Sequence, residues 1–118
     1  MVQIKYIEKG EINVDGNKYT YDIWIFSDGR VMQRDATLSP NNVIGMQEMQ
    51  VILDNSPDLY AIILGTGQET HLTVDRETLK KLAKKQIPVW DYPTDDAVLV
   101  FNQQVKEGKK VAAIFHLN

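Results

Sequence analysis

The run LYAIILG, residues 59–65, is the feature that most limits what this chain can fold into. It is as long as a typical strand, and its side chains do not alternate between apolar and polar. A continuous apolar run of this length indicates a strand that is buried on both faces, as at the centre of a parallel sheet. Such a strand needs a covering layer on each face, so the run predicts a three-layer α/β domain.

Two helices and two more strands are predicted after this run. Asp75 and Thr94 are placed as N-caps of the two helices, and Gly108 is placed to end the second one. Apolar residues at 87–92 and 109–117 predict the two strands. The first helix is expected to face the core with three apolar positions: Leu79, Leu82 and Ala83.

The first half of the chain predicts antiparallel β structure. Asp15-Gly16 lies between two β-prone runs, which is a strong hairpin signal, and a second turn is predicted at residues 27–29. Residues 17–26 between these turns are predicted to form one strand, and a stripe over 46–53 predicts a short helix. We therefore expect an α/β fold in a single domain, residues 1–118, with a central mixed sheet, two main helices plus a short one, and an N-terminal antiparallel β-meander.

Composition excludes several kinds of function. The chain has no cysteine, which removes thiol chemistry, and its net charge of −3 argues against a nucleic-acid-binding surface. Its main basic cluster, at residues 80–85, has the spacing of the solvated face of a helix. No apolar run approaches the roughly 18 residues of a membrane span. Without a signal or transit pattern the expected location is the cytoplasm, and no cofactor is predicted.

A turn, Gly65-Thr66-Gly67, follows the apolar run where ligands often bind in α/β sheets. Two glycines would let backbone N–H groups approach a small anion. The turn lacks the Lys and Ser/Thr of a phosphate-binding P-loop and the third glycine of a dinucleotide loop. A structural turn and a small-anion site therefore both remain open.

Two polar residues near this turn are candidates for chemistry. His71 or Glu69 could act as a general base, although an ordinary surface histidine is the simpler explanation of His71. His116 on the last predicted strand could join them only through the fold. Two histidines without a third ligand do not make a zinc site, so no metal is predicted.

Asn102 is polar within the apolar stripe of the last predicted helix. A buried amide must be hydrogen-bonded, so Asn102 either clamps a neighbouring backbone, such as the loop at 92–94, or contacts a ligand beside Gly67. Thr94 is placed to line the same pocket. Asp22 and Arg34 could pair across the meander as opposite charges on adjacent strands. Exposed, such a pair is worth less than about 1 kcal/mol; in a cleft it could bind a polar ligand.

Three segments together carry a family resemblance: the meander at 15–35, the run with its turn at 59–67, and PTDDAVLVFNQQVKEGKKVAAIFHL at 93–117. They resemble the small single-domain family of the mammalian adipogenesis-associated domain protein and mitochondrial complex I (NADH dehydrogenase) assembly factor 3, which includes many uncharacterised archaeal and bacterial members. The resemblance implies a three-layer α/β fold and brings no catalytic activity with it.

The function predicted from these observations is a non-catalytic module that binds a protein partner or a small anionic ligand. Its ligand-binding residues would be Gly65, Thr66, Gly67, Thr94 and Asn102. The alternative is an enzyme acting on a small anionic metabolite, with the Gly-Thr-Gly turn as anion cradle and His71 or Glu69 as general base.

Overall fold

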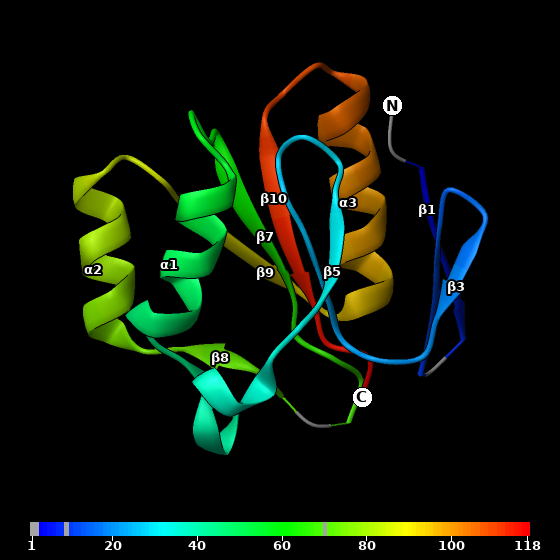
Figure 1. Ribbon diagram of the computed structural model, residues 1–118, viewed down its shortest axis with the longest axis horizontal. Helices are drawn as coiled ribbons and strands as arrows, with labels where there is room; N and C mark the ends of the chain where they lie inside the picture. Colours follow the sequence, from blue (N-terminus) through cyan, green and yellow to red (C-terminus); the bar gives the residue numbers. More distant parts are fainter. Residues whose placement is uncertain (1–2, 9, 70) are drawn as a thin grey trace.

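The centre of the computed structural model, which describes residues 3–8, 10–69 and 71–118, is a five-stranded mixed sheet (Figure 1). Its strands lie in the order β5-β4-β10-β7-β9. Strand β10 is parallel to β7, and β7 is parallel to β9. Strand β4 is antiparallel to both β10 and β5. The bounds are β4 Ile23–Ile25, β5 Val31–Gln33, β7 Ala61–Gly65, β9 Val89–Tyr92 and β10 Val111–Phe115.

Two further layers cover the faces of this sheet (Figure 1). Helices α1 (Met46–Asn55) and α2 (Arg76–Lys84) lie on one face. Helix α3 (Thr94–Lys106) lies on the other face together with an antiparallel sheet of β1 (Ile4–Glu8), β2 (Glu11–Val14) and β3 (Asn17–Tyr19). The predicted three-layer α/β fold with a mixed sheet, three helices and an N-terminal antiparallel unit is confirmed.

Side chains alternate between the two faces of the central sheet, and this divides the core into two clusters. Val111, Ala113 and Phe115 of β10 pack in the cluster under α3, whereas Ala112 and Ile114 pack in the cluster under α1 and α2. All five side chains are buried, as predicted for strands covered on both faces. Strand β7, the apolar run, is buried at every position.

The remaining segments include a short pair of parallel strands beside α1 and α2. Strand β6 (Val43–Ile44) pairs with β8 (Thr73–Val74). Two 3₁₀ turns, Ala36–Leu38 and Pro40–Asn42, connect β5 to β6. In the part of the chain that the structure describes, no helix is long and apolar enough to cross a membrane.

The prediction of one strand over residues 17–26 is wrong. The hairpin turn before it is confirmed, with φ of 52° at Asp15 and 89° at Gly16, but the segment breaks into β3 and β4 of two different sheets. The break lies just before Ile23, where the carbonyl of Asp22 accepts the Arg34 N–H and its carboxylate accepts the Leu117 N–H. These long-range bonds draw the chain out of the first sheet and into the second.

Two predictions about the helices also need correction. Thr94 is not the N-cap of α3: the cap position is Pro93, without a side-chain cap, and Thr94 is already helical. In α2, Asp75 caps as predicted by accepting the Thr78 N–H, but Leu79 is 41% exposed. Ala83 is exposed too. The buried positions of α2 are Thr78 and Leu82, which lie one turn apart. The stripe of the helix that faces the core is therefore narrower than predicted.

Candidate functional site

The turn Gly65-Thr66-Gly67 closes β7 at the carboxyl edge of the sheet, as predicted. The structure explains why glycine occupies both positions. A Cβ on Gly65 would lie 2.9 Å from Cδ1 of Phe115 and 3.0 Å from Oγ1 of Thr94. Gly67 has φ of 96°, in the left-handed region that favours glycine.

The N–H groups of this turn are already bonded within the protein. Thr66 N–H donates to the carbonyl of Tyr92 at 2.8 Å, and Gly67 N–H donates to Oγ1 of Thr94 at 2.9 Å. An anion cradle built from these two amides would have to break both bonds. The cradle therefore stays a prediction, and the turn's evident role in this conformation is structural.

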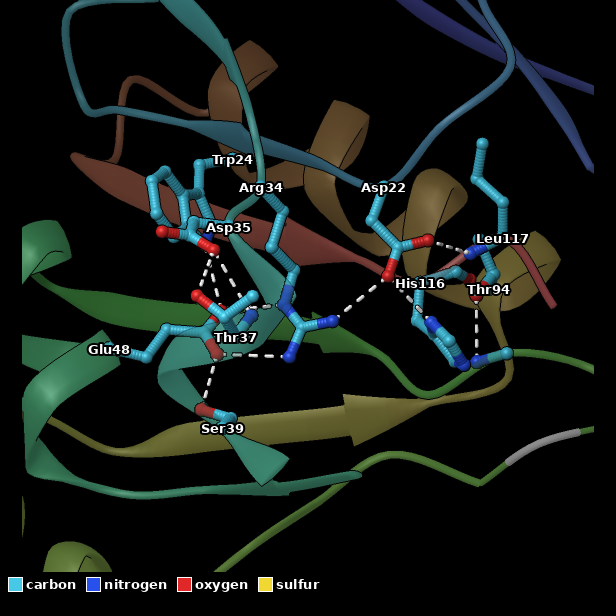
Figure 2. Close-up of polar contacts among 11 residues, drawn as sticks. Asp22, Trp24, Arg34, Asp35, Thr37, Ser39, Glu48, Thr94, His116 and Leu117 are labelled. Carbon is cyan, nitrogen blue, oxygen red and sulfur yellow. Dashed lines mark hydrogen bonds and ion pairs between the residues drawn. The ribbon is translucent and has the colours of Figure 1, made fainter. Parts of the chain in front are cut away.

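Thr94 joins the turn to the last strand. Its fully buried hydroxyl donates to the carbonyl of His116 and accepts from Gly67 N–H (Figure 2). The His116 N–H in turn donates to the carbonyl of Gly65. The predicted neighbours Gly65, Gly67 and Thr94 are thus brought together, with His116 as a fourth member.

Asn102 lies elsewhere and holds β1 against α3. Its Nδ2 donates to the carbonyl of Ile4 at 2.7 Å, and its Oδ1 accepts from Ile4 N–H at 3.0 Å. Both ends of the amide are therefore bonded to one backbone residue. A clamp is one of the two predicted roles of Asn102, although its partner is β1 and not the loop at 92–94.

The two candidates for a general base lie on the surface. Both His71 and Glu69 are exposed. The backbone N–H of Glu69 donates to the carbonyl of Asn118, and the neighbouring Gln68 donates to the carboxylate of Asp95. Among the described residues no hydrogen bond joins His71 to the turn or to Thr94, so a base assembled with the cradle stays a prediction.

A different group of charged side chains meets at this edge on the face toward α1: Asp22, Arg34, Glu48 and His116, which we call the carboxyl-edge cluster (Figure 2). Arg34 binds Glu48 with two hydrogen bonds, Nε to Oε2 at 2.7 Å and Nη2 to Oε1 at 2.9 Å. Its Nη1 also bonds Oδ2 of Asp22 at 3.0 Å. The Arg34 and Glu48 side chains are 1% and 0% exposed, so this is a buried ion pair.

Two neutral donors complete the hydrogen bonding of Glu48. Nε1 of Trp24 donates to Oε2 at 2.8 Å, and Oγ of Ser39 donates to Oε1 at 2.6 Å. A buried carboxylate without such donors would be costly, because burial removes its hydration. Glu48 is therefore anchored from β4, from the 3₁₀ turns and from the arginine at once.

His116 is held by Asp22, which lies between it and Arg34 (Figure 2). Nδ1 of His116 lies 2.7 Å from Oδ2 of Asp22, and Oδ1 of Asp22 accepts the Leu117 N–H at 2.9 Å. A carboxylate at Nδ1 places a ring proton on that nitrogen. The other ring nitrogen, Nε2, is buried, and it has no hydrogen-bond partner among the residues that the structure describes.

The pKa values of Asp22 and Arg34 reflect these contacts. Burial alone would raise the pKa of Asp22, but hydrogen bonds from His116 and Leu117, the charge of His116 and the bond from Arg34 hold it below its usual 3.8. Burial alone would lower the pKa of Arg34, whereas its bonds to Glu48 and Asp22 raise it. Both groups are therefore ionised over the physiological range.

Strand register explains why these residues meet. β10 and β4 are antiparallel with Phe115 opposite Ile23, so His116 and Asp22 are the next residues beyond that pair. Alternation turns both toward the face that carries Ile114 and Trp24. The Asp22–Arg34 pair predicted from sequence is confirmed, and it is buried on the arginine side.

Glu48 and His116 could not be recognised as members of the cluster, because no local sequence pattern marks them. Glu48 lies 14 residues from Arg34, and His116 lies 94 residues from Asp22. The one usable signal was Asp22 itself, a carboxylate on the same strand face as two bulky aromatic residues, which called for a buried partner.

A histidine oriented by a carboxylate at one nitrogen can present the other nitrogen to a ligand or exchange a proton with it. A metal ion fits this cluster less well than such a ligand, because among the described residues no three His, Asp or Glu side chains are grouped to hold one.

Comparison with known proteins identifies a family and several similar solved structures. The family described as "Protein of unknown function (DUF498/DUF598)" matches residues 4–116. The conserved hypothetical protein PH1505 from Pyrococcus horikoshii OT3 is 26% identical, with a TM-score of 0.83 over 98% of each chain. The structure named MT938 is 24% identical, with a TM-score of 0.81 over 100% of this chain and 99% of that one.

A solution structure from Bordetella pertussis, described as a Mth938-like domain, is similar in fold as well. It is 16% identical, with a TM-score of 0.68 over 98% of this chain and 85% of that one. No curated protein matches the sequence.

Proposed function

Since the chain belongs to the DUF498/DUF598 family of unknown function, we propose its role from its own geometry: a non-catalytic module that binds a small ligand at the carboxyl-edge cluster. The observation that carries the proposal is Nε2 of His116, a buried polar atom without a partner among the described residues. Most buried polar atoms in proteins are hydrogen-bonded, and an exception calls for an explanation.

The bonds around His116 fix where a ligand would bind. Asp22 holds Nδ1, so the ring cannot turn to satisfy Nε2 without losing a charged hydrogen bond. Leaving a buried nitrogen unpaired costs about 1–3 kcal/mol. A ligand atom that bonds Nε2 would recover this free energy, which supports a binding role for the free side of the ring.

The protonation state of His116 sets which kind of ligand atom Nε2 can bond. When His116 is neutral, one guanidinium faces two carboxylates, so the cluster carries a net charge of −1. A proton on His116 cancels that charge and makes Nε2–H a donor. A small carboxylate or phosphate could then accept from it, in agreement with the small anionic ligand predicted from sequence.

The turn Gly65-Thr66-Gly67 forms the neighbouring wall of the proposed site. His116 bonds the carbonyl of Gly65 through its N–H and the hydroxyl of Thr94 through its own carbonyl. Because Nε2 is buried, ligand entry requires a neighbouring segment to shift, and in this proposal that segment is the turn. Gly65, Thr66, Gly67 and Thr94 therefore act in the proposal through the position of the turn, and Asn102 acts only as a clamp.

Native mass spectrometry of gently purified protein tests the proposal. We expect an added mass on the wild-type chain that is lost in His116→Ala. His71→Ala is the matched control, because it removes an exposed histidine outside the cluster, and it should keep the added mass. An added mass retained by folded His116→Ala would contradict the proposal.

Two finer sequence-based predictions stay predictions. An enzyme with His71 or Glu69 as general base draws no support from the cluster, since both residues are exposed whereas Nε2 of His116 is buried. An accessory role like that of the complex I assembly factor is compatible with a non-catalytic binding module, but the family description names no function.

A further inference from the structure

The outward face of α3 carries an apolar side chain at its centre. Leu99 is 67% exposed, the largest exposed fraction among the bulky apolar residues of the described chain. The inward face of the same helix is buried through Thr94, Ala97, Val98 and Phe101. Leu99 is therefore on the wrong side of the helix to serve the core, and single exposed leucines need no explanation unless their surroundings are apolar too.

Two hollows flank Leu99 and make its surroundings distinctive. One, of about 470 Å³, lies between α3 and the edge strand β9 and is lined by Trp90, Tyr92 and Val100 among others. The second, of about 550 Å³, lies between α3 and β1, with Leu99 on its border as well. A protruding leucine between two hollows is a shape that can interlock with a copy of itself.

We propose that this surface binds a second copy of the chain through an antiparallel pairing of α3 with α3. A two-fold axis near Leu99 would place the leucine of each copy in a hollow of the other. The same patch then serves both partners, which closes the assembly at a dimer. Aromatic side chains such as Trp90 and Tyr92, at the wall of the first hollow, are enriched in interfaces of this kind.

The charges along α3 select the antiparallel arrangement. Its first turn carries Asp95 and Asp96, and its last turn carries Lys106. At 1.5 Å per residue, Asp95 lies about 6 Å before Leu99 along the axis and Lys106 about 10 Å after it. An antiparallel partner therefore brings each acidic turn within reach of the other copy's lysine, whereas a parallel partner would place like charges together.

The inference does not rest on a ligand at the carboxyl-edge cluster, and sedimentation equilibrium of the full chain tests it. We expect a reversible dimer whose dissociation constant rises at least about tenfold in Leu99→Asp, or about 1.4 kcal/mol, because the symmetric interface would then bury two unpaired carboxylates near its axis. Met32→Asp is the control, because Met32 is 47% exposed on β5, at the opposite edge of the sheet. It should leave the dissociation constant unchanged.

A charge exchange tests the orientation. Asp96→Lys and Lys106→Asp should each weaken the dimer, and the double variant should restore it. Circular dichroism of each variant confirms that it is folded. A wild-type chain that stays monomeric up to its solubility limit would overturn the inference, even if Leu99 were found to bind a different protein. Equal effects of Leu99→Asp and Met32→Asp, or a double variant as weak as the single ones, would overturn it as well.

Discussion

Thr94 shows how a residue chosen by sequence for one role can serve another. Its place before an acidic turn predicted an N-cap, but its buried hydroxyl instead bridges Gly67 N–H and the carbonyl of His116. Residue type and spacing were informative, because a hydroxyl was needed there. The partners could not be predicted, since they lie 27 and 22 residues away in the chain.

Thr94→Val should destabilise the fold by about 1–3 kcal/mol, because it keeps the shape but leaves a buried N–H and a buried carbonyl without a partner. Thr94→Ser keeps the hydroxyl and should lose clearly less. Urea unfolding of both variants measures the difference. A loss in Thr94→Val no larger than the loss in Thr94→Ser would contradict the role given to the two hydrogen bonds.

Asp22 predicts a specific acid dependence. Its pKa is lowered in the folded chain, so its contribution to stability is present above the unfolded value of about 3.9 and is lost as pH falls through the folded pKa. Asp22→Asn should be less stable at neutral pH and should lose less further stability below about pH 4. The free energy of unfolding of the wild type and of Asp22→Asn, measured from neutral pH downward, gives the slope of stability against pH for each protein. Equal slopes below about pH 4 would contradict a lowered pKa of Asp22.

At the scale of elements, periodic and continuous apolar patterns predicted helices and strands correctly, whereas a break within one alternating pattern could not be predicted. The buried strand β7 and the helices α1 and α3 lie where the patterns placed them. The division of residues 17–26 into β3 and β4 was missed because alternation continues through the break. Only the long-range bonds of Asp22 to Arg34 and Leu117 define it, and local patterns do not contain them.

The clamp between α3 and β1 depends on one side chain. Asn102→Ala removes both bonds to Ile4, so hydrogen exchange should speed up in β1 and β2 more than in β7 or β10. Asn55→Ala is the control, because that amide bonds Val51 of its own helix and Arg30, both outside β1 and β2. It should leave β1 and β2 protected. Faster exchange throughout the chain in Asn102→Ala would indicate that β1 does not open separately.

For the whole molecule, the carboxyl-edge cluster joins elements that are distant in sequence. Arg34 follows β5, Glu48 lies in the first turn of α1, and His116 follows β10. The three-layer fold was predictable because each layer has its own pattern. The cluster was not, apart from the Asp22–Arg34 pair, because its members meet only after the sheet has assembled.

Glu48→Ala tests what this buried pairing contributes. Removing one partner of a buried ion pair typically costs about 3–5 kcal/mol, and Arg34 would keep only its bond to Asp22. The exposed pair of Arg30 and Asp28 has the same 2.7 Å separation, so Asp28→Ala is a control matched in distance but not in burial. Its loss should stay below about 1 kcal/mol. Thermal or urea unfolding compares the two, and losses of similar size would contradict the role given to burial.

The most direct test of the proposed function is the ¹⁵N NMR signal of the His116 imidazole during titration with inorganic phosphate and with a small carboxylate. We expect Nδ1 to keep the signature of its bond to Asp22, and Nε2 to shift in a saturable way with at least one probe. His71 should show no saturable shift. A saturable shift at His71 instead of His116, or an Nε2 signal that stays unchanged with both probes, would contradict a small-anion site at the carboxyl-edge cluster.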